Sequence, residues 1–302
     1  RTRRSQGWLI PALAGLTLAA LVQTFTALSN ASITSPTVIV RAAIALASGA
    51  VLIWLHRRTP DPPLPITALR SGGAPMLFVV VIVVPFVNLW YYMTLAYQYV
   101  FGYSAMQTAL LMVVPQLAGV VGALAARTAI QRRGITITGT TMLGGLAASL
   151  LLTLLIGTTT STWLIVLIMC VYAFSSVAAG VAVTNAVMNT APTGGEADVS
   201  SYRGAAIHAG TAIGIVVMST VVYAAAVGSF NASVADSGLD QQESEQIAEG
   251  LRSGETSQQV GSLYAAPASD VAEVDTAQQK AMIDGLHAHG LYGAAFIGFA
   301  AA

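Results

Sequence analysis

Residues 75–134 read PMLFVVVIVVPFVNLWYYMTLAYQYVFGYSAMQTALLMVVPQLAGVVGALAARTAIQRRG and hold two long apolar runs separated by a short polar turn. Each run exceeds the roughly 20 residues that a helix needs to cross a hydrocarbon core about 30 Å thick. In the turn, Ser104 and Gln107 have the Ser-x-x-Gln spacing of a capping box, which favours the start of a second helix. The stretch therefore predicts a helical hairpin that crosses a membrane twice.

The composition of the whole chain agrees with a membrane protein. Charged residues make up 9% and hydrophobic residues 55%, with a mean hydropathy of +0.70, whereas soluble domains average about 25% charged residues. A soluble fold is excluded by these values. The single cysteine, Cys170, excludes a disulfide framework and a cysteine-based metal site.

Run length predicts eight membrane spans, and all should be helices because unpaired backbone groups cannot face lipid. Their approximate bounds are 8–28, 37–56, 75–98, 105–127, 134–157, 162–188, 203–227 and 286–302. The predicted fold class is thus all-α, a polytopic membrane helix bundle.

Positive charge predicts the orientation of these spans. Ten of the 13 Lys and Arg fall on the side of the amino end, and three fall on the other side, so the first side is expected to be cytoplasmic. Ten of the 13 Asp and Glu lie between residues 236 and 284, in a polar segment, 228–285, that is expected to face outward. Two short helices are predicted in this segment, around 238–252 and 275–288.

A proline-rich connector suggests the domain organisation. Residues 57–74 contain four prolines that prevent a continuous helix, so they are expected to form a cytoplasmic link. Residues 1–56 would then form two linker transmembrane helices. Residues 75–302 would form a six-helix bundle that includes the extracytoplasmic loop 228–285.

Titratable side chains are sparse in the predicted spans. None of the eight contains Asp or Glu, which excludes a carboxylate proton relay within them. His208 could titrate near neutral pH and carry a linked proton, or it could be a hydrogen-bonded packing residue. His287 and His289 point in two directions on a helix with no third ligand nearby, so no metal is expected. Only these two histidines and Asp284 come close to an enzymatic group of residues, so no enzymatic activity and no cofactor are expected.

Polar residues within the spans are the candidates for substrate contact. Asn88, Tyr91 and Tyr92 have helical spacing that places them on one face, which would suit an amphipathic or cationic organic molecule. Gln116 lies in mid-membrane beside a proline and could also line a cavity, as could Asn185 near an inner end. The alternatives are an aromatic belt at the outer interface, indicated by Tyr97, Tyr99 and Tyr103, and helix bridging for Asn185.

Three stretches resemble one family. They are PPLPITALRSGG (62–73), YQYVFGYSAMQTALLMVVPQLAG (97–119) and GEADVSSYRGAAIHAGTAIGIVV (195–217). They are similar to the linker, the hairpin and the entry to the penultimate span in the carboxy-terminal part of 14-span drug:proton antiporters of the major facilitator superfamily. The loop GALAARTAIQRRG resembles that family's basic cytoplasmic loop motif, through Arg127, Arg132 and Arg133, although Ile130 or Gln131 stands where an Asp is often found.

The resemblance implies a proton-coupled exporter of drugs or other amphipathic organic compounds, located in the bacterial inner membrane and working by alternating access. Its expected partners are the lipid bilayer, a small amphipathic substrate, protons and an amino-terminal six-helix half of the same chain that carries the proton acids; nucleic acid is not expected. Two alternatives remain open: an exporter of an endogenous metabolite or antibiotic, and a truncated membrane scaffold without activity.

Overall fold

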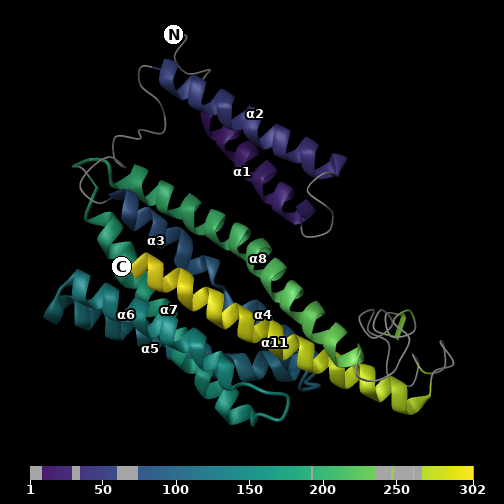
Figure 1. Cartoon of the computed structure of the whole chain (residues 1–302). Coiled ribbons are helices and arrows are strands. Elements are labelled where there is room, and N and C mark those ends of the chain that lie inside the picture. Colours follow the sequence, from purple (N-terminus) through teal and green to yellow (C-terminus); the bar gives the residue numbers. More distant parts are fainter. Residues whose placement is uncertain are drawn as a thin grey trace.

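A computed structural model describes residues 9–28, 35–59, 74–191, 193–235, 242, 246–247, 261 and 267–301. In this part of the chain the regular structure is entirely helical (Figure 1). The elements are α1 (Leu9–Leu28), α2 (Pro36–Arg58), α3 (Ala74–Phe86), α4 (Leu89–Tyr99), α5 (Ala105–Arg133), α6 (Ile135–Leu151), the 3-10 turn η2 (Leu152–Leu155), α7 (Thr162–Met188), α8 (Glu196–Ala235) and α11 (Ala268–Ala301). The prediction of an all-α helix bundle is confirmed.

Most predicted spans coincide with helices that are long and apolar enough to cross a membrane. Six such helices occur in the described residues, corresponding to the second through seventh predicted spans. The first predicted span forms α1, whose apolar part, Leu9–Thr24, is shorter. The eighth lies in the carboxy-terminal half of α11, which is not among the six.

The first two helices form a hairpin that lies beside α8 (Figure 1). Ser35 begins α2 by accepting a hydrogen bond from the Val38 N–H at 3.3 Å, and Pro36 occupies the first turn, where its missing N–H costs nothing. The Thr17 hydroxyl donates to Ser48 Oγ at 3.0 Å and joins the two helices. The connector 60–73 lies outside the described residues.

The remaining helices pack around α7, the most buried of the candidate spans. It contacts α5, α6 and α3, while α8 packs on α3 and α11. Two glycines one turn apart on α8 explain its contact with α3: a Cβ added at Gly210 or Gly214 would collide with the α3 backbone at Ile82 or Phe86. Only glycine lets these backbones approach so closely, as in other membrane helix pairs.

The predicted capping box is present at the start of α5. Ser104 Oγ accepts from the Gln107 N–H at 3.3 Å, and the Ser104 N–H donates to Gln107 Oε1 at 2.9 Å. Both partners satisfy N–H groups that the first turn of a helix would otherwise leave unpaired. The hairpin turn between α4 and α5 therefore follows from the local sequence.

The span predicted over 75–98 is present, but its helix is interrupted near the middle. The helix stops at Phe86, one residue after Pro85, and a new helix starts at Leu89. Proline lacks the N–H that would continue the helical ladder, and Asn88 adopts an extended conformation that caps the next helix. As a result Asn88 does not share a helical face with Tyr91 and Tyr92.

The polar segment 228–285 is also more helical than predicted at its two ends. Helix α8 continues to Ala235 and α11 already begins at Ala268, so the separate helix predicted over 275–288 is instead continuous with the last span. The two helix ends share a small apolar core that includes Phe230, Val234, Val271 and Val274. Most of the helix predicted over 238–252 lies outside the described residues.

Candidate functional site

The break between α3 and α4 is held by a tyrosine from α7. The Tyr172 hydroxyl donates to the Val87 carbonyl at 3.0 Å and accepts from the Leu89 N–H at 3.1 Å. All three residues are buried, so neither backbone group has water as an alternative partner. One side chain thus satisfies two of the backbone groups that the interruption leaves without a helical partner.

A pocket of about 590 Å³ opens beside this break, between α3, α4, α7 and α8. Its size lies within the range of small-molecule sites, roughly 300–1,000 Å³. The wall is mostly apolar, and its aromatic members are Trp90 and Tyr172, whose rings meet edge to face at 6.1 Å. The polar and charged side chains of the wall are Asn88, Ser176, Thr184, Asn185, Arg203 and Thr211, together with the Tyr172 hydroxyl.

One end of the pocket carries a positive charge. Arg203 Nε donates to Thr184 Oγ1 at 3.0 Å, and the Thr184 hydroxyl in turn donates to the Gly180 carbonyl at 2.6 Å. The threonine proton is therefore directed away, and its oxygen lone pair faces the guanidinium. None of the lining residues in the described chain is acidic.

The five predicted substrate contacts separate into two groups. Asn88 and Asn185 line the pocket, where Asn185 Nδ2 donates to the Val181 carbonyl at 2.9 Å. Tyr91 and Gln116 are exposed elsewhere and do not reach it, while Tyr92 is 4% exposed and packs in the core. Sequence spacing alone missed Trp90, Tyr172 and Arg203.

Tyr92 belongs to a buried contact between α4, α8 and α11. Its hydroxyl lies 3.1 Å from Ser219 Oγ and 3.2 Å from the Ile215 carbonyl, to which it donates. Its ring centroid lies 4.6 Å from that of His289. His289 is fully buried, and neither ring nitrogen has a hydrogen-bond partner in the described chain.

The residue predicted to carry a linked proton, His208, lies exposed on α8 and is not part of this contact.

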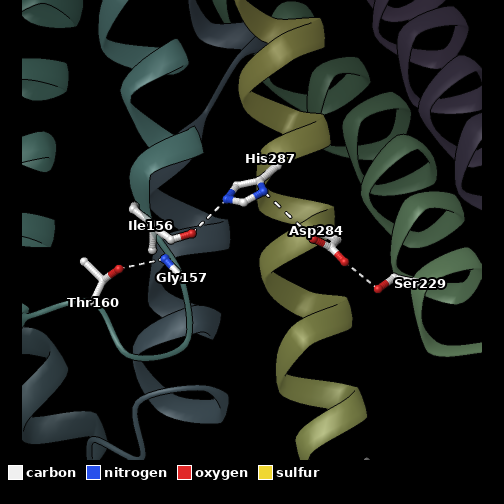
Figure 2. A network of polar contacts seen from close by, with 6 residues as sticks. All are labelled: Ile156, Gly157, Thr160, Ser229, Asp284 and His287. Atoms are coloured by element: carbon white, nitrogen blue, oxygen red, sulfur yellow. Dashed lines mark hydrogen bonds and ion pairs between the residues drawn. The ribbon is translucent and has the colours of Figure 1, made fainter. Parts of the chain in front are cut away.

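A polar network joins three elements at the opposite end of the bundle (Figure 2). The Ser229 hydroxyl on α8 donates to Asp284 on α11, and His287 Nε2 donates to the Ile156 carbonyl at 2.8 Å. His287 Nδ1 lies 3.9 Å from Asp284 Oδ1, close enough for an ion pair when the imidazole is protonated. The network links α8 and α11 to the turn before α7.

The basic loop motif lies at the carboxyl end of α5. Arg127, Arg132 and Arg133 are exposed there, and the last two complement the partial negative charge of the final helical turn. Gly134 ends the helix with a positive φ of 82°, which a residue with a side chain rarely adopts. The three arginines are not part of the pocket wall.

The sequence of this chain matches a known protein family. The family model described as Major Facilitator Superfamily covers residues 7–215, which is more than half of the chain. This chain belongs to the major facilitator superfamily. No curated protein matches it closely enough to count as a relative. The major facilitator membership and the apolar helices make it an integral, multi-pass membrane protein of a family of secondary transporters rather than enzymes.

Proposed function

We propose that this chain is part of a proton-coupled secondary transporter that exports drugs or other amphipathic organic compounds by alternating access. The pocket beside the α3–α4 break carries the proposal. Binding sites of secondary transporters form where a membrane helix is interrupted, because the freed backbone and nearby polar side chains can then face a cavity. Here Pro85, Asn88 and Trp90 at the break all line a largely apolar pocket of suitable size.

The contacts within the bundle support movement as one body. Glycine-mediated packing joins α8 to α3, and the network of Ser229, Asp284 and His287 joins α8 and α11 to the turn before α7. A bundle fixed at both places can rock against an amino-terminal half of the same chain while the contacts at these two places stay intact. This is the mechanical requirement for alternating access.

His289 is a stronger candidate for a linked proton in this half than His208. A fully buried imidazole without a hydrogen-bond partner is costly to keep, and such groups are often retained for function. We infer that movement of α11 relative to α4 exposes His289 to a proton. His208, on the exposed surface of α8, remains a second candidate.

The test is transport by the full-length protein reconstituted in proteoliposomes with an imposed pH gradient. Proton-driven accumulation of an amphipathic dye, abolished by a protonophore, is expected. Accumulation that needs ATP and ignores the protonophore would contradict the coupling, and the absence of movement for a panel of cationic, neutral and anionic dyes would contradict export. His289→Gln should uncouple transport from the gradient, with His208→Gln as the comparison.

A further inference from the structure

The charged end of the pocket suggests which substrates it accepts. Arginine carries five N–H donors, and only Nε of Arg203 has an acceptor in the described chain, Thr184 Oγ1. Arg203 makes no ion pair with a described acid, and it is half-buried rather than free in solvent. A guanidinium held in this way presents its two outer nitrogens as a fork for an oxyanion.

The rest of the pocket indicates the length and the apolar character of the ligand. Thr184 and Tyr172 lie 12 residues apart on α7, which corresponds to about 18 Å along the helix axis. Between these two levels the α7 wall includes Val177, Gly180 and Val181. At the Tyr172 end, the ring of Trp90 offers a flat aromatic surface. The pocket is therefore basic at one end and aromatic at the other.

We propose that the pocket selects amphipathic organic anions, with a carboxylate or similar oxyanion bound by Arg203 and an apolar ring system lying toward Trp90. This rests on the proposed function and narrows its substrate class. The positive charge, uncompensated by any acid in the pocket wall, disfavours the organic cations that the aromatic residues alone would accept. An anionic phospholipid headgroup offers the same oxyanion chemistry and is the competing source of the ligand.

The test uses three pyrene probes that differ only in their end group: pyrenebutanoate, pyrenebutanol and pyrenebutyltrimethylammonium. Binding to the full-length protein is measured in nanodiscs of neutral phosphatidylcholine, with empty nanodiscs subtracted. The butanoate should bind most tightly. Arg203→Gln should weaken its binding about 10- to 100-fold, as expected for loss of a hydrogen-bonded charge, and leave the alcohol unchanged.

Three further variants separate recognition from folding. Arg203→Lys keeps the charge without the fork and should recover part of the butanoate affinity. Trp90→Ala should weaken all three probes by a similar factor because it removes the surface for the ring. Arg41→Gln is the matched control: Arg41 also donates one hydrogen bond to a neighbouring helix, to the Gln23 carbonyl of α1, but it lies on α2 away from the pocket.

Each outcome decides the proposal. Equal weakening of all three probes in Arg203→Gln, or equal binding of the three by the unmodified protein, would overturn it. Replacing part of the lipid with phosphatidylglycerol distinguishes the two sources: competition that disappears in Arg203→Gln would assign the site to lipid headgroups rather than transported anions. Binding is measured without a proton gradient, so it tests anion selection independently of proton-driven transport. Either proposal can therefore be contradicted while the other is supported.

Discussion

Two predicted spans carry a proline near their middle, and only one of them breaks. Pro85 is followed within two residues by the end of α3, whereas Pro115 lies inside α5, which runs uninterrupted to Arg133. Each proline leaves the carbonyl of the residue four positions earlier without its helical donor. The proline alone therefore does not decide whether a membrane helix is interrupted.

The two helices differ in the residues that surround each proline. At the break, the Asn88 side chain accepts from the Trp90 N–H at 3.2 Å, and the Tyr172 hydroxyl satisfies the backbone at Val87 and Leu89. Around Pro115, the support is close packing: a Cβ added at Gly122, two turns later, would collide with the Phe174 backbone of α7. Polar partners make an interruption tolerable in lipid, and tight apolar packing keeps a helix continuous.

The largest expected effect tests the packing of the unbroken span. Gly122→Val places a side chain against the α7 backbone, where no side chain can rotate away, and should lower the free energy of unfolding by about 3 kcal/mol. Gly144→Val is the control, because a Cβ there meets nothing within 4 Å. Denaturation of the purified protein in detergent measures both; similar losses in the two variants would contradict the packing argument.

The next effect tests the broken span. Tyr172→Phe keeps the ring but leaves the Val87 carbonyl and the Leu89 N–H without partners, which should cost about 2 kcal/mol. Tyr223→Phe, at a side chain that is 63% exposed, should change little. If Tyr172→Phe unfolds at the same denaturant concentration as the unmodified protein, the hydroxyl does not hold the break.

A smaller effect is expected at the cap of α4. Asn88→Ala removes the acceptor for the Trp90 N–H and should cost about 1 kcal/mol, while Asn88→Ser retains an acceptor and should recover most of it. Thermal unfolding in detergent compares the variants. Equal stability of the alanine and serine variants would contradict the capping role of this side chain.

The smallest effect is expected at the second proline. Pro115→Ala restores the missing N–H to a helix that is already continuous, so stability should stay within about 1 kcal/mol or rise slightly. Binding at the pocket should not change, because Pro115 is absent from its wall. A clear loss of stability or binding would show that this proline has a role that the continuous helix conceals.

The sequence predicted what depends on neighbouring residues. The capping box of Ser104 and Gln107 and the apolar spans follow from local spacing, and the structure confirms them. The break could not be predicted, because the hydroxyl that stabilises it comes from Tyr172, 83 residues beyond Leu89. Likewise, Thr184 and Arg203 lie on different helices, and only their packing makes them one end of a pocket.

Residue type alone did not predict which candidate side chains lie in the pocket, because that depends on which face of each helix packs against another helix. Gln116 has the polarity expected of a binding residue, yet it lies on the exposed side of α5. From the sequence, His208 was the predicted proton carrier, and His289 was considered only with His287 as a metal pair. Burial, which distinguishes the two, is a property of the assembled helices.

The paired ends of α8 and α11 also have a practical use. At 1.5 Å per residue, the 40 residues of α8 extend about 60 Å, twice the thickness of a hydrocarbon core. Their shared core around Phe230 and Val274 makes the projecting part stiff. Such a projection would extend beyond the detergent micelle that surrounds the membrane spans. An antibody fragment bound to it would provide a feature for aligning particle images in electron microscopy.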